Sequence, residues 1–507
     1  MFDLFAKSTF DGHHSRKFLP EGSLTRLVTE GSIRLELEDK KLQRDPIVVD
    51  LVPYICSKAT KLFATAVYMK STRKTLLRVM HQLHSNDFTD EDLPMQLVDG
   101  KSRWTELRWS KDRMEDFYDA QWAFLAPVFS PSQVYYELSS DCILPLLDLE
   151  AKDVGVFAFS SMTKGRIHED HISRTQWTSN ECFAVKQISR NCTAKEMDRF
   201  LDRKELRRVS ASDHPHIVCL IAAVTKGSNI YYISPWADGG NLRDFWGQDK
   251  RLSLNKDGVT ESVSQLRGLS DALKRLNRCL FRPHGHLKPE NILVFPNNKS
   301  SIGHLNKGDW GLAEKYLEPR RRRQNQMTTR YGTRLYEAPE AVIQRDTRSL
   351  CYDTWALGCV ALEHLVWLLY GEKEHDRFVA PLAKADVEGF HRSAGERPIV
   401  NPDVVRWMEH ISAHFPLGTG VGDLVKVLRT KMLVIDLPPK PGTEVSDQPI
   451  NGPYRADTWE INFSLDRILI RLKYEDDYCF SDRPYDGLGG PEDDSAITQA
   501  SSSGESD

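Results

Sequence analysis

The segment at residues 284–294, HGHLKPENILV, is the feature that most restricts what this 507-residue chain can fold into. It fits the loop pattern H-R-D-L-x-x-x-N at three positions, including Asn291, while Gly285 replaces the Arg and His286 replaces the Asp. A single loop of this kind could arise by chance. Its meaning therefore depends on whether other motifs accompany it elsewhere in the chain.

Further motifs lie on both sides of this loop. They are residues 182–188 (CFAVKQI), 309–311 (DWG), 332–340 (GTRLYEAPE) and 353–358 (DTWALG). In this order and at these distances they resemble the motifs of protein kinases. We therefore predict a bilobal protein-kinase fold of the α+β class, preceded by a helical N-terminal domain.

The resemblance assigns the lysine that contacts the α- and β-phosphates of ATP to Lys186, in the apolar strand motif. We predict a helix over residues 193–209, and Glu205 within it is placed to pair with this lysine. Glu196 is a weaker alternative for the same role.

The resemblance also predicts a magnesium site. In kinases the loop Asn and the Asp of D-F-G hold the metal ions that bridge the phosphates of ATP, which here are Asn291 and Asp309. Lys288, two residues after the base position, suits a serine/threonine kinase and is a further candidate catalytic residue. The predicted cofactors are therefore ATP and Mg²⁺.

A hinge between the two lobes is predicted at residues 235–242 (PWADGGNL). By the same resemblance, Trp236, Ala237 and Asn241 of this hinge are candidate nucleotide contacts. Gly155, which aligns with the third glycine of the kinase phosphate loop, is the fourth candidate.

The phosphate loop departs from the kinase pattern. A glycine-rich loop, G-x-G-x-x-G, uses residues without Cβ so that backbone N–H groups can approach the phosphates closely. Only the third glycine, Gly155, is present, whereas Glu150 and Lys152 bring side chains into this segment. We expect weakened nucleotide binding, and not its loss.

His286 is the more serious departure, because the Asp of this loop accepts the proton of the substrate hydroxyl. A positioned general base contributes about 10²–10⁴-fold to a rate. A neutral imidazole can accept a proton, but it lacks the carboxylate's charge, and magnesium would repel its protonated form. We therefore expect impaired phosphotransfer.

Three functions remain open. The first is a signalling or scaffold protein that binds Mg-ATP and transfers phosphate poorly. The second is an active serine/threonine kinase that acts on protein hydroxyls. The third is a small-molecule phosphotransferase, which the motifs at residues 338–340 and 353–358 disfavour because they build a protein-substrate lobe.

Composition narrows the partners and the compartment. A net charge of -4 predicts no bulk attraction to nucleic acid or to an anionic membrane, so we expect ATP and a protein as partners. We find no secretory signal and no run of about 18 apolar residues that would span a membrane. Nine scattered cysteines indicate reduced thiols, and we expect a cytoplasmic or nuclear protein.

Four regions are predicted along the chain. They are a helical N-terminal region (1–147), the kinase N-lobe (148–236), the kinase C-lobe (237–480) and a disordered acidic tail (481–507). The first contains an aromatic cluster, which we interpret as core packing in preference to a docking face for another protein. Its members are Trp104, Trp109, Phe117, Tyr118, Trp122, Phe124 and Phe129.

The arrangement resembles a group of filamentous-fungal protein-kinase-like proteins in which a helical segment precedes the kinase domain. The likeness is carried by residues 88–94 (FTDEDLP), 121–129 (QWAFLAPVF) and 352–359 (YDTWALGC), together with the strand, hinge and loop motifs. It covers roughly residues 20–475 and implies a serine/threonine kinase. A glycine at the position of Gly285 is ordinary in this family, whereas a histidine at the position of His286 is not.

Two other segments have open interpretations. The four arginines at residues 320–323 are interpreted as a solvated loop, with a clamp for a phosphothreonine or an acidic partner as the alternative. His168 and His171 have the H-x-x-H spacing that can bind a metal. We favour a polar loop there, since it precedes a strand.

Overall fold

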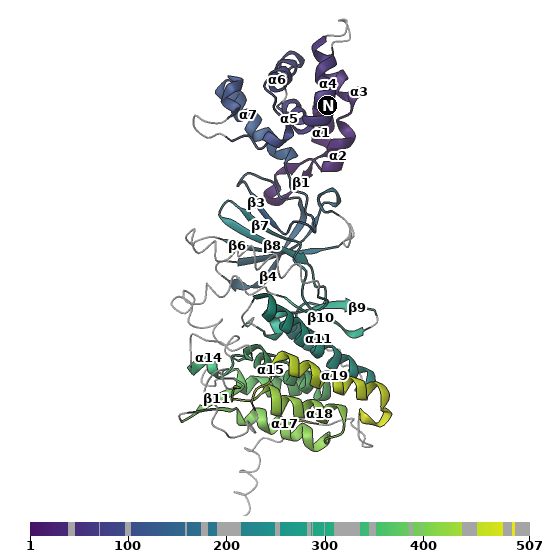
Figure 1. The fold of residues 1–507 in the computed structure, drawn as a ribbon, viewed down its shortest axis with the longest axis vertical. Coiled ribbons are helices and arrows are strands. Elements are labelled where there is room, and N and C mark those ends of the chain that lie inside the picture. Colours follow the sequence, from purple (N-terminus) through teal and green to yellow (C-terminus); the bar gives the residue numbers. More distant parts are fainter. Residues whose placement is uncertain are drawn as a thin grey trace, which may run out of the picture. The chain divides into compact units, whose positions relative to one another are not determined.

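The fold comes from a computed structural model, which describes residues 1–38, 46–69, 71–96, 103–157, 160–173, 181–189, 214–248, 254–280, 285, 287–298, 300–308, 335–343, 351–384, 389–395, 397–438, 454–479 and 489–491 (Figure 1). The chain forms two compact units. The first unit comprises residues 1–192 and 220–236, and the second comprises residues 193–219 and 237–507.

The first unit begins with a helical part and a short β-ribbon. Its helices are α1 (Phe2–Ser8), α2 (Glu21–Leu27), α3 (Glu30–Leu37), α4 (Pro46–Lys58), α5 (Thr60–Tyr68), α6 (Arg73–Ser85) and α7 (Lys111–Gln121), and the ribbon pairs β1 (Phe10–Asp11) with β2 (Lys17–Phe18). α4 and α5 are separate helices, because the backbone leaves the helical region at Ala59. The carboxylate of Asp90 then accepts hydrogen bonds from the first N–H groups of α5, at Lys61 and Leu62.

A six-stranded sheet completes the described part of the first unit, in the order β3-β7-β8-β6-β5-β4. The strands are β3 (Tyr135–Leu138), β4 (Leu146–Phe157), β5 (Ser160–Ile167), β6 (Phe183–Ser189), β7 (Ala222–Lys226) and β8 (Asn229–Pro235). β3 runs parallel to β7, and the other pairs are antiparallel. β3 and the start of β4 precede residue 148, so the sheet begins inside the stretch that the sequence assigns to the helical region.

The aromatic cluster is buried apart from the half-buried Tyr118, as the core interpretation predicts, but it is divided between separate cores. Trp104, Trp109 and Phe117 pack together in the helical core. Trp122 packs in a small cluster with Phe18, and Phe129 lies in the core of the sheet. The aromatic residues therefore contribute to the cores of both the helical part and the sheet of the first unit.

The second unit is mainly helical. Its helices are α10 (Leu242–Trp246), α11 (Lys256–Leu280), α14 (Glu340–Ile343), α15 (Tyr352–Tyr370), α16 (Glu372–Leu382), α17 (Pro402–His414), α18 (Gly420–Val427) and α19 (Thr458–Tyr474). Two hairpins accompany them, β9 (Ile292–Asn297) with β10 (Ser300–Lys307), and β11 (His391–Ala394) with β12 (Arg397–Val400). α11 packs along α19 (Figure 1).

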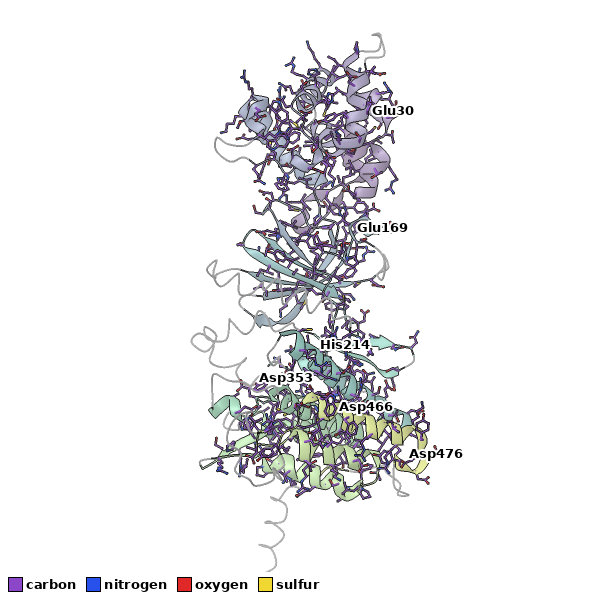
Figure 2. All side chains as sticks on the ribbon, viewed as in Figure 1. Glu30, Glu169, His214, Asp353, Asp466 and Asp476 are labelled. Carbon is purple, nitrogen blue, oxygen red and sulfur yellow. The ribbon has the colours of Figure 1, made fainter. Side chains whose placement is uncertain are left out.

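α15 is the centre of this unit. Every one of its 19 residues is buried, and the motif at residues 353–358 lies at its beginning. Its polar residues include Asp353, Glu363 and His364, and Figure 2 labels Asp353 at its beginning. Among the described helices, none is long and apolar enough to cross a membrane.

Candidate functional site

Lys186 lies in the middle of β6, between two neighbouring strands. Its Cα is in register with Tyr232 on β8 and with Met162 on β5, so pairing on both sides fixes its position along the sheet. The side chain is half-buried. The apolar run that predicts a strand here, Phe183, Ala184 and Val185, is buried in the sheet.

The segment that corresponds to a glycine-rich loop forms part of the long strand β4. Glu150 is exposed and lies opposite Lys164 on β5, and the backbone continues in strand conformation through Gly155 to Phe157. The pairing with β5 is regular from Glu150 to Lys152, and its register shifts between Lys152 and Phe157, so Gly155 lies in the irregular part of β4.

The predicted hinge begins at the end of β8. The backbone N–H of Trp236 donates a hydrogen bond of 3.0 Å to the carbonyl oxygen of Cys182. The Lys164 ammonium lies 5.3 Å from the centre of the Trp236 ring, within reach of a cation–π interaction. In the second unit Ala237, the next residue, is buried.

The second half of the hinge is attached to β9. Gly239 donates its backbone N–H to the carbonyl oxygen of Val294 at 3.1 Å, and Val294 donates in return to Gly240 at 2.9 Å. A Cβ on Gly239 would lie 2.6 Å from the Val294 carbonyl oxygen, and Gly240 has a φ of +71°, so both positions favour glycine. Asn241 then caps α10, since its side-chain oxygen accepts the backbone N–H of Asp244 at 3.0 Å.

The loop after α11 is anchored at both of its described ends. The buried backbone N–H of Gly285 donates to the Asp353 carboxylate at 2.8 Å, and Gly285 has a φ of +79°. A short 3₁₀ turn, Pro289–Asn291, ends the loop, with the N–H of Asn291 donating to the Lys288 carbonyl. Both Lys288 and Asn291 are half-buried.

A backbone hydrogen bond connects this loop to the residue before the D-W-G triplet. The N–H of Gly308 donates to the carbonyl oxygen of Asn291 at 2.9 Å. β9 and β10 pair directly beside it, with Ile292 opposite Lys307. The chain therefore brings the candidate ligand Asn291 next to the start of the second predicted metal-binding segment.

Glu363 of α15 is the centre of a buried polar cluster. Its carboxylate accepts hydrogen bonds from Arg243 at 2.8 Å and from the Tyr336 hydroxyl at 2.6 Å, and it lies 3.2 Å from His375 Nε2. Arg243 also contacts the carboxylate of Glu290 at 3.3 Å. The cluster joins α10, the loop at 285–291, residues 335–340 (here called the A-P-E segment) and α16 to the central helix.

The charges in this cluster compensate each other. Burial alone would raise the pKa of Glu363, but Arg243 and the hydrogen bonds from His375 and Tyr336 outweigh it and hold that pKa below its ordinary value. Burial and the nearby carboxylate raise the pKa of Tyr336 well above its usual range. At neutral pH the hydroxyl is therefore a donor, and Glu363 is an anion paired with Arg243.

A second buried pair holds the A-P-E segment. Arg455 is almost fully buried, and its guanidinium donates to the Glu340 carboxylate at 2.8 Å and to the Val434 carbonyl oxygen at 2.8 Å. It also lies 4.9 Å from the centre of the Trp355 ring. Glu340 is thus tied to α15 through one arginine from a distant part of the sequence.

Several predicted residues lie outside the described residues. These are His286, Glu205 with the helix expected at 193–209, Asp309, and the arginines at 320–323. Lys186, Gly155 and Trp236 belong to the first unit, and Ala237, Asn241, Lys288 and Asn291 belong to the second.

Sequence reasoning did not identify Arg243 or Arg455. The sequence does indicate that Glu363 needs a partner such as Arg243. Glu363 is a charged residue in an apolar helix, and a buried charge requires a counter-ion. Nothing in the sequence points to the particular arginine that supplies it.

The H-x-x-H segment forms a 3₁₀ turn, Glu169–His171, and its histidines contact the protein. His168 Nδ1 accepts the N–H of Asp170 at 3.2 Å. His171 Nε2 accepts the N–H of Glu21 at 3.3 Å, and its Nδ1 lies 3.0 Å from the Pro127 carbonyl oxygen. Among the described residues, no group of His, Cys, Asp or Glu is arranged to hold a metal ion.

Comparisons with known proteins agree with the motif order. Residues 172–385 match the family model described as protein kinase domain. The chain is 27% identical to NUAK family SNF1-like kinase 1 of Mus musculus over 234 residues, which is 46% of this chain and 32% of that protein. It is 30% identical to serine/threonine-protein kinase CG17528 of Drosophila melanogaster over 179 residues, which is 35% of this chain and 22% of that protein. The chain thus spans less than a third of the length of these relatives.

Proposed function

Taking a protein kinase domain of mixed helices and strands as the premise, we propose that this chain binds Mg-ATP and acts in signalling with impaired phosphotransfer. The observation that carries the proposal is the 2.9 Å hydrogen bond from Gly308 N–H to the Asn291 carbonyl. It fixes the candidate ligand Asn291 beside the residue that precedes Asp309. The anchoring of Gly285 on Asp353 supports the proposal, because it fixes the other end of the loop.

The side chains of the proposed site suit Mg²⁺ and the phosphates of ATP. Mg²⁺ prefers oxygen ligands, and the side-chain oxygens of Asn291 and Asp309 are of that kind. Lys186 supplies a point charge for the α- and β-phosphates from a strand that is paired on both sides, and Glu205 is its proposed partner. When bound, Mg-ATP supplies the phosphoryl group, and the metal neutralises part of its charge.

The remaining contacts of the proposed nucleotide site are weaker than in an ordinary kinase. Gly155 lies within β4, and we propose that Glu150, five residues earlier on the same strand, brings a negative charge toward the phosphates. Trp236 and Ala237 are the proposed contacts for the base. Asn241 already uses its side chain to cap α10, so its contact with nucleotide is the least supported of these assignments.

His286 limits the chemistry in this proposal. The acceptor hydroxyl must lose a proton as the phosphoryl group is transferred, and an imidazole takes it without the charge of a carboxylate. Lys288 lies in the same loop and adds a further positive charge that disfavours a protonated His286. Positioning by the rest of the loop is kept, so a low residual rate is expected.

The proposed organisation follows the sequence. We propose that residues 1–147 are a mainly helical region that ends in β3 and the start of β4, that 148–236 and 237–480 are the two lobes, and that 481–507 are an acidic tail. We place the protein among the filamentous-fungal kinase-like proteins. Its proposed partner is another protein, in the cytoplasm or nucleus.

Nucleotide binding is tested by thermal unfolding of the full chain with millimolar Mg-ATP. A ligand at 100 times its dissociation constant stabilises the folded state by about 2.7 kcal/mol. We expect a rise in Tm that is lost in Lys186→Met and reduced in Asn291→Ala. Lys226→Met, at a half-buried lysine of the same sheet, is the matched control and should keep the rise. The same Tm with and without Mg-ATP would refute binding.

Phosphotransfer is tested with radiolabelled ATP and a generic protein acceptor, comparing the wild type with His286→Asp. We expect a gain of about 10²-fold or more when the carboxylate is restored. A wild type as active as His286→Asp would favour the alternative, an active serine/threonine kinase. Transfer to a small hydroxyl compound, and none to protein, would favour a small-molecule phosphotransferase. The buried pair of Arg455 with Glu340 makes this last outcome unexpected, since it builds the A-P-E segment of a protein kinase.

A further inference from the structure

α19 carries an exposed apolar stripe on its outer side. Trp459, Phe463, Ile470 and Tyr474 are between 56% and 72% exposed, and the rings of Trp459 and Phe463 stack with an angle of 11° between their planes. Single exposed apolar residues are common, but a continuous row on one helix marks an interaction surface. We call these four residues and Arg467 the α19 stripe.

The α19 stripe is distinct from the face that holds the helix in place. Ile461, Leu465, Ile468 and Leu472 of the same helix are buried in the core of the second unit. The stripe residues follow spacings of four, four, three and four, which keep them on one side of a helix of 3.6 residues per turn. From Phe463 onward the spacing is that of a coiled-coil seam, which packs best against another helix.

The acidic side chains of α19 form ion pairs, Asp466 with Arg267 at 2.9 Å and Glu460 with Lys431 at 2.7 Å. Glu475, the residue that follows the helix, pairs with Arg471 at 2.9 Å. Asp466 is labelled on this helix in Figure 2. Acidic charge on this helix is therefore matched by basic residues of the same unit.

Two basic residues, one on the stripe and one beside it, form no ion pairs with the residues that the structure describes. Arg467 is exposed at its centre and forms no ion pair in the part of the chain that the structure describes. Lys473 is exposed at one end, lies 5.1 Å from the centre of the Tyr474 ring and forms no ion pair among the described residues. The stripe therefore combines aromatic anchors with uncompensated positive charge, and Trp, Tyr and Arg are the residues enriched at binding hot spots.

We propose that the α19 stripe is a docking surface for an acidic amphipathic helix of another protein. The apolar face of that helix covers Trp459, Phe463, Ile470 and Tyr474, and a carboxylate pairs with Arg467. The stripe extends for about 22 Å at 1.5 Å per residue, which matches a partner helix of about four turns. Pairing of a charged group at the centre fixes the register of the partner helix.

A second copy of this chain fits the surface less well. A two-fold interface brings the same surface of both copies together. Arg467 lies at the middle of the stripe, so either a parallel or an antiparallel pair of α19 helices would place two arginines opposite each other. Like charges in contact disfavour that arrangement.

The test uses the full chain and two synthetic helical peptides of 18 residues in fluorescence anisotropy. Both peptides carry leucine along one face, and the flanking positions are glutamate in one and lysine in the other. We expect the glutamate peptide to bind at least about tenfold more tightly than the lysine peptide. Phe463→Ala should weaken its binding about tenfold or more, and Arg467→Glu should reverse the preference between the peptides.

Leu417→Ala is the matched control, because Leu417 is an equally exposed apolar residue of the same unit that lies outside the stripe. It should bind the glutamate peptide as the wild type does. Equal affinity for both peptides, or unchanged binding by Phe463→Ala, would overturn the proposal. A dimer in sedimentation analysis that Phe463→Ala converts to monomer would overturn the choice of partner in favour of a second copy.

Discussion

The guanidinium of Arg243 donates a hydrogen bond of 2.8 Å to the carboxylate of Glu363, whose side chain has no exposure to solvent. Removing one partner of a buried ion pair leaves the other charge uncompensated, which typically costs about 3–5 kcal/mol. Arg243→Met should therefore lower the free energy of unfolding of the second unit by that amount at pH 7. Urea unfolding followed by tryptophan fluorescence measures it, since Trp246 and Trp355 are buried in this unit.

The double variant Arg243→Met/Glu363→Leu is the control, because it removes both charges and should recover most of the loss. The deficit of the single variant should also shrink as the pH falls. In the wild type the lowered pKa of Glu363 contributes stability that is lost as the pH falls through it. In Arg243→Met burial raises that pKa, so protonation at mildly acidic pH relieves the penalty. A deficit that is equal at pH 5 and pH 8 would contradict the assignment.

The close approach of the hinge to β9 predicts a steric effect. Gly239→Ala would place a Cβ 2.6 Å from the Val294 carbonyl oxygen, so the backbone must shift. We expect a loss of about 1–3 kcal/mol, measured as a lower Tm, since overpacking typically costs this much. The same substitution at Gly31, in α3 with nothing within 4 Å, should stabilise the first unit slightly because alanine favours the helix. Equal effects at the two positions would contradict the tight contact.

The hydrogen bond from Gly285 to Asp353 predicts a local loosening of the loop. Asp353→Ala leaves a buried N–H without its acceptor, which costs about 1–3 kcal/mol. We expect faster hydrogen exchange at residues 285–291, while exchange in β9 changes less. Asp353→Asn keeps an oxygen acceptor and should preserve most of the protection. Equal exchange in both variants would show that the hydrogen bond does not hold the loop.

The sequence predicts the local elements of the second unit better than their connections. The apolar run after Asp353 is long enough to indicate a buried helix, and α15 has that form. The pairs of Arg243 with Glu363 and of Arg455 with Glu340 join residues 120 and 115 positions apart. No local pattern specifies such pairs, because only the folded topology brings them together. The sequence likewise predicts that the aromatic residues at 104–129 belong to a core. It does not predict that they are divided between separate cores.

Protonation of His171 should weaken the first unit. The ring is fully buried, its Nε2 accepts the N–H of Glu21, and the neutral ring therefore donates from Nδ1 to Pro127. Burial lowers the pKa of His171 to about 4, so between about pH 6.5 and pH 4 the unfolded chain binds a proton that the folded chain does not. Stability then falls with decreasing pH by about 1.4 kcal/mol per pH unit for this residue. His171→Gln should reduce the slope of unfolding free energy against pH by about that amount, whereas His81→Gln, at an exposed position of α6, should leave it unchanged. An unchanged slope in His171→Gln would show that another group controls the acid response.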